Sequence, residues 1–328
     1  MKILLVHNFY GSSAPSGENA VFEAEKALLQ EKGHEVGFFT RHSDEIRNKG
    51  FLGTVQGALA TPWNPRMSCA MQKVIADFRP DVVHAHNIFP LISPAIFRAI
   101  GQKAASVLTL HNYRLFCPAA IPMRNGNVCT ECLDKKSSFP SLLYGCYRDS
   151  RIATLPLAFN VGLHRFLRTW ANRVDTFIAL SDFQAKLMVK SGLPAAKVAV
   201  KPNFFPGKPQ VVPWKQRKSY VIFVGRLSAE KGVENLLRAW QMWGSKAPEL
   251  YLVGDGELRS KLMRMAEDLP VRFTGQVTAQ EAHNQIAKAK LLILPSECFE
   301  GFPMAVREAF AFGTPVAVSN IGPLPAIV

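Results

Sequence analysis

The sequence predicts an α/β protein built from two doubly wound domains, and three observations support this prediction. Short apolar runs recur along the 328 residues, and each ends in polar or glycine-containing residues. Helix-like stretches lie between many of these runs, an alternation typical of parallel sheets with helices on both faces. One stretch, residues 205–217, breaks the alternation with prolines, a glycine and basic residues, as a linker does.

The linker divides the chain into an N-terminal domain at residues 1–204 and a second domain at residues 218–328. We expect the two domains to face each other across a cleft, with ligands at the carboxyl ends of the strands. An insertion at about residues 113–150 in the first domain is long and poor in regular pattern. The apolar runs that we expect to form strands are residues 2–8, 35–40, 81–87, 106–112, 176–182, 220–226, 250–256, 271–275, 291–297 and 315–320.

Charge and composition narrow the classes of partner. The chain has 39 Lys and Arg against 25 Asp and Glu, a net charge of +14, which favours anionic partners such as nucleotides. We find no zinc-finger spacing of the C2H2 type, no RNA-recognition signature and no long basic run, so we do not expect nucleic acid as a partner. The chain has no apolar run of membrane-spanning length and its start does not resemble a signal peptide, so we expect a cytoplasmic protein.

The first two elements follow from short-range patterns. The run KILLVHN, residues 2–8, is continuously apolar before its polar end, as in a strand buried on both faces. Residues 19–33 then place Val21, Ala24 and Leu28 on one face of a helix that ends at a Lys-Gly pair.

The last elements carry two carboxylates. Residues 291–294, LLIL, predict a buried strand, and Pro303 can open a helix over residues 304–312 that stops at Gly313. Glu300 lies in the loop between this strand and this helix.

The second carboxylate belongs to the helix itself. Four of its residues share one face at helical spacing, and they are Ala305, Glu308, Ala309 and Phe312. Glu308 therefore packs among inward-facing residues, and a half-buried carboxylate needs partners. The residues alone leave two interpretations open: a structural salt bridge or helix-end contact, or two acids that grip a polyhydroxylated ligand.

Several motifs in order resemble the donor-binding domain of glycosyltransferase family 4, whose members are retaining enzymes of the GT-B fold. These motifs are YVIFVGRLSAEKGVENLL, LYLVGDGEL, VRFTGQV and ECFEGFPMAVREAFAFGTPVAVSNIG. The first domain matches more loosely, through MKILLVHN, SGENAVFEAEKALLQEKGHEV, DVVHAHN and TLHNYRLFCP. The resemblance implies a GT-B fold with an acceptor-side N-terminal domain. The family continues beyond the point where this chain stops, so we expect the second domain to be truncated.

The resemblance assigns roles in donor binding to residues around the second-domain strands. Arg226 and Lys231 match the residues that bind the donor diphosphate, a pairing of forked guanidinium and ammonium that suits two linked phosphates. Gly254 and Gly256 would allow close backbone approach to the ligand, a signal that is weak alone because plain connectors also use such glycines. The segment from Gly275 to Val277 resembles the one that cups the nucleotide base.

The resemblance also answers what the two carboxylates do. Glu300 matches the residue that contacts hydroxyls of the donor sugar, and Glu308 matches the one that binds the ribose hydroxyls, because carboxylates only accept hydrogen bonds. The backbone amides of Gly301 and Phe302 would help to hold the phosphates. The family usually has Gly-Phe-Gly here, and the proline at 303 removes one amide.

Residues in two segments of the first domain complete the predicted site. Ser16 and Gly17 resemble the loop that lies under the donor, where the family often has two glycines. His111 ends a strand and matches a residue near the reacting sugar, which contacts a donor hydroxyl or assists the acceptor. His84 and His86 are weaker candidates for that role.

The resemblance implies a hexosyltransferase that needs neither a metal nor a cofactor for catalysis. We expect a UDP-sugar donor, with a GDP-sugar as the alternative, and a glycan or lipid-linked acceptor in cell-surface polysaccharide biosynthesis. Two other functions stay open: a nucleotide-sugar-binding fragment without turnover, and another GT-B enzyme such as an epimerase.

Four clustered cysteines suggest a structural metal. Cys129 and Cys132 have the C-x-x-C spacing of metal ligands, and Cys117 and Cys146 flank them. In a cytoplasmic protein such thiols favour structural zinc over disulfides. The alternative is that they pack as small apolar groups.

One basic amphipathic stretch raises the question of membrane contact. Residues 163–173 place an apolar stripe beside arginines, and the stripe consists of Leu163, Phe166, Leu167 and Trp170. Such a helix could rest on the acidic inner face of the cytoplasmic membrane. The alternative is a core-facing helix with a solvated basic side.

Overall fold

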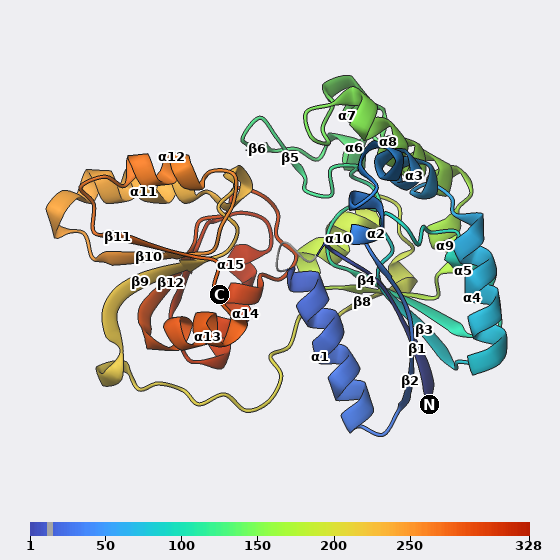
Figure 1. Ribbon diagram of the computed structural model, residues 1–328, viewed down its shortest axis with the longest axis horizontal. Coiled ribbons are helices and arrows are strands. Elements are labelled where there is room, and N and C mark those ends of the chain that lie inside the picture. The colour runs from blue at the N-terminus through green and yellow to red at the C-terminus, as the bar shows by residue number, and fades with distance from the viewer. Residues whose placement is uncertain (12–15) are drawn as a thin grey trace. The chain divides into compact units, whose positions relative to one another are not determined.

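The computed structural model describes residues 1–11 and 16–328, and the chain divides into two compact units (Figure 1). The first unit contains residues 1–122 and 130–202, and the second contains residues 123–129 and 203–328. Each unit has its own parallel sheet, so the predicted α/β class is confirmed. The predicted runs all form strands in these sheets.

The first unit is built on a six-stranded sheet in which every strand pair is parallel. Its strands are β1 (Lys2–Phe9), β2 (Glu35–His42), β3 (Val82–Asn87), β4 (Ala105–Leu110), β7 (Thr176–Ala179) and β8 (Val198–Val200). The order across the sheet is β2-β1-β3-β4-β7-β8. Because β1, β3 and β4 are neighbours and parallel, the polar residues that end them meet at one edge of the sheet.

Three helices of the first unit begin where a side chain accepts a hydrogen bond from a free amide of the first turn. Asn64, Ser150 and Ser181 each accept a hydrogen bond from a backbone amide of the first turn that follows them. The helices are α1 (Gly17–Glu31), α2 (Asp44–Arg47), α3 (Gly50–Ala60), α4 (Pro65–Phe78), α5 (Ile96–Ile100), α6 (Glu131–Asp134), α7 (Phe139–Tyr144), α8 (Arg151–Phe166), α9 (Thr169–Arg173) and α10 (Asp182–Lys190), with a 3-10 turn at Ala195–Lys197.

The predicted amphipathic helix at residues 163–173 is wrong as a single helix. The chain breaks at Arg168, whose φ of 50° lies in the left-handed region, so α8 ends at Phe166 and α9 starts at Thr169. Trp170 is buried in the core, whereas Phe166 is 85% exposed. The predicted apolar stripe therefore does not form one surface.

The second unit has a five-stranded parallel sheet in the order β11-β10-β9-β12-β13. Its strands are β9 (Lys218–Val224), β10 (Glu249–Val253), β11 (Val271–Gly275), β12 (Ala289–Leu294) and β13 (Val316–Val318). A separate antiparallel hairpin consists of β5 (Met123–Arg124) and β6 (Asn127–Val128). The helices are α11 (Val233–Trp243), α12 (Arg259–Met265), α13 (Ala279–Lys288), α14 (Met304–Ala311) and α15 (Leu324–Ile327), with 3-10 turns at Trp214–Gln216, Ala229–Lys231 and Gly244–Lys246.

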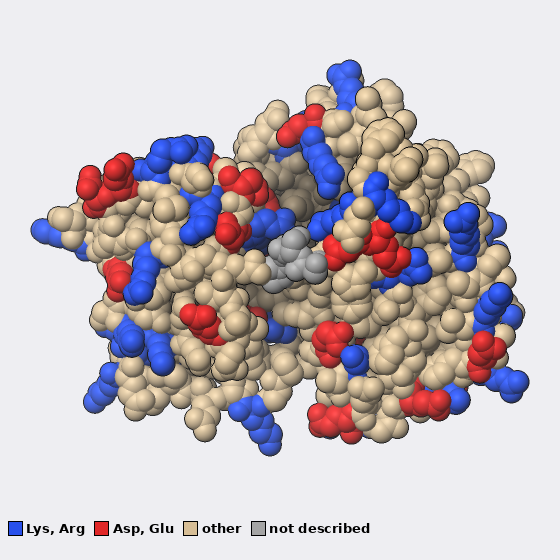
Figure 2. Space-filling view, viewed as in Figure 1, with Lys and Arg blue, Asp and Glu red and all other residues tan. Residues whose placement is uncertain are grey.

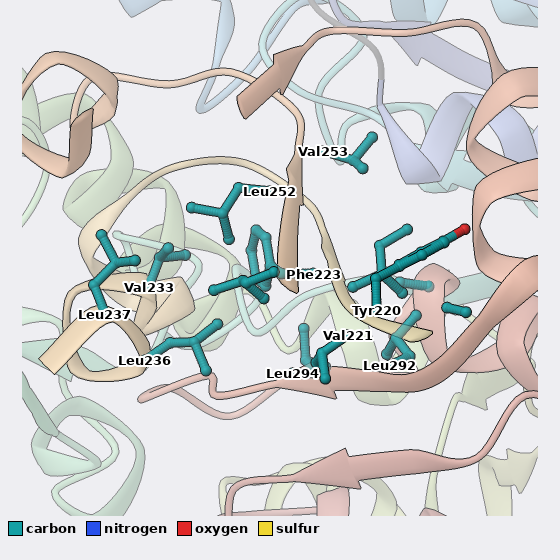
Figure 3. Packing of buried hydrophobic residues seen from close by; sticks show 14 of the residues in the cluster. Tyr220, Val221, Phe223, Val233, Leu236, Leu237, Leu252, Val253, Leu292 and Leu294 are labelled. Atoms are coloured by element: carbon teal, nitrogen blue, oxygen red, sulfur yellow. The ribbon is translucent and has the colours of Figure 1, made fainter. Parts of the chain in front are cut away.

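The core of the second unit lies where α11 packs on the central strands (Figure 3). Phe223 of β9 and Leu252 of β10 are fully buried, and Leu237 of α11 packs with them. Burial on both faces explains the unbroken apolar runs of these strands in the sequence. The rigid sheet fixes the loops at its carboxyl ends, where the predicted donor residues lie.

The end of the linker is fixed to the second unit by one buried guanidinium. Arg217 donates to the carbonyl oxygens of Ala287, Ala289 and Phe312 and to the hydroxyl of Thr314. Because a buried charge needs several partners, this fork holds the start of β9 against the end of α14.

Candidate functional site

The centre of the candidate site in the second unit is an ion pair between two of the predicted residues. The Nζ of Lys231 lies 2.7 Å from Oε1 of Glu300, and the Ser296 hydroxyl donates to the same oxygen at 2.6 Å. Lys231 ends the 3-10 turn after β9, and Glu300 lies in the loop after β12, so neighbouring strand ends bring them together. Burial lowers the pKa of Lys231, but the charge and hydrogen bond of Glu300 outweigh it and raise the pKa above its ordinary value.

A glycine makes this close approach of two loops possible. Gly232 has φ +67°, and a Cβ on it would lie 1.9 Å from the carbonyl oxygen of Pro295. A backbone hydrogen bond from Glu297 to the Glu230 carbonyl joins the same two loops at 2.9 Å. Glycine is therefore required next to Lys231 both for its backbone conformation and for space.

Glu308 occupies a different, half-buried environment on α14. Its Oε1 lies 3.2 Å from Nη2 of Arg307 and 3.6 Å from Nε2 of His283. Burial raises the pKa of Glu308, while His283 and Arg307 oppose that rise. The predicted helical face is confirmed, since Ala305 and Ala309 are buried.

The loop before α14 and the helix itself are held to the two residues that precede the linker. The side-chain amide of Asn203 donates to the carbonyl oxygen of Phe302 at 3.1 Å, and Arg307 donates to the Phe204 carbonyl at 2.6 Å. Pro303 is the residue that caps α14 rather than its first helical residue, so its missing amide falls at the helix entrance. Gly301 and Phe302 are half-buried beside it.

Arg226 differs from Lys231 in its exposure. Its side chain is 65% exposed and lies 3.9 Å from Glu230, as in a surface ion pair of small energy. The guanidinium can therefore reorient toward an anion at little cost.

Gly254 and Gly256, two of the predicted glycines of the second unit, serve the chain's own packing. A Cβ on Gly254 would lie 2.0 Å from the Gly225 carbonyl oxygen, and one on Gly256 would lie 2.4 Å from the Leu227 carbonyl oxygen. Gly275, at φ +70°, has open space where a Cβ would be. The close approach expected of the first two glycines is thus made to backbone, and contact with a donor stays a prediction.

A pocket of about 530 Å³ is lined by residues of β9, β10, β11 and α13 of the second unit. Tyr220 and Tyr251 stack in it with ring centroids 4.2 Å apart. Among the predicted donor residues, Val277 lines this pocket, whereas Lys231 and Glu300 lie elsewhere. The pocket therefore does not mark the centre of the predicted site.

The first unit gathers histidines at the carboxyl ends of β1, β3 and β4. His86 Nδ1 lies 3.1 Å from His111 Nε2, so one ring donates a hydrogen bond to the other. Burial lowers the pKa of His111 to about 3 and that of His86 well below the usual value, so both rings are neutral at pH 7. His111, with Asn112 and Arg114, also lines a small cavity.

A buried carboxylate that the sequence did not predict contacts this histidine cluster. Glu25 of α1 is buried and accepts from His84 Nδ1 at 2.8 Å, with His86 Nε2 3.9 Å from the same oxygen. Burial alone would raise the pKa of Glu25, but His84 and the cation of Lys201 bring it to about 2. A buried carboxylate under His86 was not predicted, because Glu25 is one of many charged residues in an amphipathic helix.

Glu25, His84 and His86 are also the described residues that best meet the geometry of a metal site. Their ligand atoms lie within 4.8 Å of one another. Lys201 lies 3.2 Å from the second oxygen of Glu25, and its charge would repel a metal cation. We therefore interpret the cluster as a hydrogen-bonded support of His111.

The predicted loop before α1 is described only in part. Ser16 precedes α1 and Gly17 begins it, while residues 12–15 lie outside the described part of the chain. The next residue, Glu18, accepts a hydrogen bond from Asn112 at 2.9 Å. Because Asn112 follows His111, Glu18 is a further polar residue near His111 that we did not predict. Burial raises the pKa of Glu18.

The four clustered cysteines, all among the described residues, are not in disulfides. Cys117, Cys132 and Cys146 belong to the first unit, and Cys129 ends the segment grouped with the second. Burial and the neighbouring Cys132 raise the pKa of Cys117 to about 12, so metal binding would have to displace a tightly held proton. The zinc site stays a prediction.

Comparison with protein families identifies the class that these two units define. The family model described as Glycosyltransferase Family 4 matches residues 17–206, and the one described as Glycosyl transferases group 1 matches residues 205–328. Two Rossmann-like units with these matches define a GT-B glycosyltransferase fold. The chain belongs to glycosyltransferase family 4.

Individual relatives support the same fold and family. The chain is 26% identical to the putative teichuronic acid biosynthesis glycosyltransferase TuaC of Bacillus subtilis, over 98% of this chain and 82% of that protein. It is 24% identical to the sulfoquinovosyl transferase SQD2 of Arabidopsis thaliana, over 95% of this chain but only 58% of the relative.

One relative has a higher identity over part of the chain, and a solved structure matches the whole chain. A GDP-mannose-dependent alpha-mannosyltransferase of Corynebacterium glutamicum is 38% identical over 37% of this chain and 28% of its own length. The crystal structure of Anabaena HepE in complex with UDP-glucose has a TM-score of 0.60 at 19% identity, covering 100% of this chain and 83% of HepE. At this identity the structural likeness concerns the fold alone.

Proposed function

We propose that the protein is a retaining glycosyltransferase that moves a hexosyl group from a nucleotide-sugar donor to an acceptor hydroxyl. The observation that carries the proposal is the contact of Lys231 with Glu300. These residues are 69 positions apart in the sequence, yet a hydrogen bond joins them at the ends of neighbouring strands. A cation beside a hydroxyl-binding carboxylate is what a sugar joined to a diphosphate requires.

Donor binding would exchange the partners of this ion pair. Lys231 and the exposed Arg226 turn to the diphosphate, whose charge replaces that of Glu300. Glu300, still held by Ser296, then accepts hydrogen bonds from sugar hydroxyls. Glu308 accepts from the ribose hydroxyls.

The remaining predicted residues surround the nucleotide in this proposal. Backbone amides at Gly301 and Phe302 hold the phosphates beside the start of α14. The loops at Gly254, Gly256, Gly275 and Val277, and the Ser16–Gly17 segment of the first unit, supply further backbone contacts.

The reaction follows a same-face displacement. The bond between the anomeric carbon and the phosphate oxygen breaks while the acceptor oxygen bonds to that carbon on the same face. The acceptor proton passes to the leaving phosphate oxygen. Arg226 and Lys231 stabilise the growing phosphate charge, so this scheme needs no metal. His111, neutral at pH 7, exchanges a hydrogen bond with a substrate hydroxyl.

We propose a UDP-sugar as the donor, with a GDP-sugar as the alternative, and a glycan or lipid-linked acceptor of cell-surface polysaccharide. The names of three relatives refer to teichuronic acid biosynthesis, to sulfoquinovosyl transfer and to dependence on GDP-mannose. A cytoplasmic location follows from the use of nucleotide sugars.

Product analysis tests the proposal. The protein is incubated with radiolabelled UDP- and GDP-hexoses and undecaprenyl-linked or oligosaccharide acceptors, and release of nucleoside diphosphate and product is measured. We expect transfer with one donor, an α-linked product from an α-donor by proton NMR, and loss of at least about a hundredfold in Glu300→Gln. Glu297→Gln, three residues away, is the matched control and should retain activity.

The outcome distinguishes the alternatives. Nucleotide binding without release of diphosphate would identify a binding protein without turnover. A changed sugar configuration without an acceptor product would identify an epimerase. A product of inverted configuration would contradict the retaining mechanism.

A further inference from the structure

The carboxylate of Glu25 lies inside the first unit, beside the histidines of β3. Figure 2 shows acidic and basic side chains spread over the visible surface, where water and salt screen their charge. Glu25 is only 8% exposed, and the helix that carries it, α1, packs against β1 and β3. Its charge therefore acts on neighbouring groups with much less screening than a surface carboxylate would.

The two oxygens of this carboxylate have different partners. Oε2 lies 3.2 Å from Nζ of Lys201. Oε1 accepts a hydrogen bond from Nδ1 of His84 at 2.8 Å, and Nε2 of His86 lies 3.9 Å from the same oxygen. The other nitrogen of His84 lies 2.8 Å from the hydroxyl of Thr109, so this ring is held on both sides. These contacts fix Oε1 beside His86.

His86 and His111 share one hydrogen bond, and two neutral rings can form it in two ways. Nδ1 of His86 lies 3.1 Å from Nε2 of His111. Both rings are neutral at pH 7, so each has one N–H group. In the first arrangement, Nε2–H of His111 donates to Nδ1 of His86, whose own proton is on Nε2. In the second, Nδ1–H of His86 donates to Nε2 of His111, whose own proton is on Nδ1.

The charge of Glu25 distinguishes these two arrangements. Nε2 of His86 is buried and has no hydrogen-bond partner among the described residues. In the first arrangement this nitrogen is an N–H group, and its positive hydrogen lies near the carboxylate. In the second it carries a lone pair only 3.9 Å from the negative oxygen, which is repulsive where water is excluded. The carboxylate therefore favours the first arrangement.

We propose that Glu25 is a positioning residue that acts through His86 to set the tautomer of His111, and that Nδ1 of His111 is thereby kept as a hydrogen-bond acceptor. Nε2 of His111 is used by His86, so Nδ1 is the ring nitrogen that no described residue occupies. An unprotonated Nδ1 accepts a hydrogen bond from a substrate hydroxyl and cannot donate one to a carbonyl or ether oxygen. This role in transfer rests on the proposed function, whereas the tautomer is a property of the ligand-free protein.

The alternative role of Glu25 is to anchor α1 to the sheet through His84 and Lys201. In that case, loss of the carboxylate would lower the free energy of unfolding and leave the proton of His111 in place. The tautomer of His111 therefore separates a positioning role from a structural one.

Nitrogen-15 NMR of the full chain with ring-labelled histidine tests the proposal at pH 7 without ligand. Protonated and unprotonated ring nitrogens have well separated chemical shifts, and the signals of His86 and His111 are assigned by their loss in His86→Gln and His111→Gln. The test variant is Glu25→Gln, which keeps the size of the side chain and removes its charge. Glu31→Gln is the matched control on α1, since the Glu31 side chain is 72% exposed. Circular dichroism and thermal unfolding establish that the variants fold.

We expect wild-type His86 and His111 to carry their protons on Nε2, each in at least about fivefold excess over the other tautomer. Glu25→Gln should raise the Nδ1–H form of His111 at least about threefold, and Glu31→Gln should leave it unchanged. Wild-type His111 protonated mainly on Nδ1 would overturn the proposal. An unchanged tautomer in folded Glu25→Gln would also overturn it.

A second variant keeps the proposal testable if Glu25→Gln does not fold. Lys201→Met removes the cation at Oε2, whose side chain is half exposed, and leaves the carboxylate in place. With less compensation of the negative charge, the Nε2–H form of His111 should be kept or increased. A rise of the Nδ1–H form in this variant would contradict control by the carboxylate.

Assays of sugar transfer show which of the two proposals fails. Transfer by a protein whose His111 is protonated on Nδ1 would refute the role of Glu25 and leave the proposed function standing. The expected tautomers in a protein that transfers no sugar would support the role of Glu25 in setting the tautomer and contradict the proposed function.

Discussion

Alanine substitutions at two glycines test how the loops that carry Lys231 and Glu300 pack together in the candidate site. Gly232 and Gly275 have nearly the same backbone conformation, with φ of +67° and +70°. They differ in space, since a Cβ on Gly232 would lie 1.9 Å from the Pro295 carbonyl oxygen and one on Gly275 would meet nothing within 4 Å. Alanine at each position therefore imposes the same conformational strain but only one steric conflict.

The two alanine variants should therefore lose different amounts of free energy of unfolding. Left-handed alanine costs about 1–2 kcal/mol, partly offset by about 0.4–1 kcal/mol from the reduced freedom of the unfolded chain. Gly275→Ala should therefore lower the free energy of unfolding by about 1 kcal/mol. Forcing a methyl group against a backbone carbonyl adds about 1–3 kcal/mol, so Gly232→Ala should cost about 2–4 kcal/mol.

Urea unfolding followed by tryptophan fluorescence measures both costs. Trp214, Trp240 and Trp243 lie in the second unit and report on its transition. Because Gly232 follows Lys231, its substitution should also weaken nucleotide binding more than Gly275→Ala does. Equal losses of stability in the two variants would refute the steric reasoning.

The other predictions concern the ion pair, the histidines and the cysteines. In a double-mutant cycle, Lys231→Met and Glu300→Gln should show a coupling energy of about 1–3 kcal/mol in unfolding experiments without ligand, and additive effects would contradict a direct interaction. The folded pKa of His111, about 3, is depressed below the unfolded value of 6.5, so its contribution to stability is present above pH 6.5 and is lost as the pH falls toward 3. His111→Gln should flatten this part of the pH dependence measured by urea unfolding, and an unchanged slope would show that the ring is not held neutral. If the cysteines hold zinc, metal analysis should find about one zinc per chain that is lost in Cys117→Ser with a lower melting temperature, whereas a metal-free folded protein would exclude the site.

The strands were predictable because burial on both faces leaves a direct trace in the sequence. Runs such as KILLVHN have no polar interruption, and the structure forms a strand at each predicted run. The short strand β8, Val198–Val200, was missed because three residues give too little pattern. The break between α8 and α9 was missed because the left-handed conformation at Arg168 has no marker such as glycine or proline.

Site residues were predictable where residue type and sequence spacing both matched a motif. They were less predictable where contacts between distant parts of the chain determine which residues meet. Resemblance pointed to Lys231 and Glu300, but their direct contact depends on the packing of two loops around Gly232. The buried position of Glu25 could not be read from the sequence, because a helix with period 3.6 places charged residues at many positions beside its apolar face. Its partners come from β3 and from Lys201, which are distant in the chain.

Thermal unfolding of the protein with UDP, GDP and ADP tests the central claim most directly. Ligands that bind only the folded state raise its melting temperature, by several degrees at about 100 times the Kd for a unit of this size. The test variants are Lys231→Ala and Glu308→Gln, and Lys246→Ala and Glu267→Gln are matched controls on exposed positions of the same unit. We predict stabilisation by one nucleotide, most by UDP, that is lost in both test variants and kept in both controls. Stabilisation by none of the three in a folded sample, or equal stabilisation of the test variants, would contradict a nucleotide-sugar site at these residues.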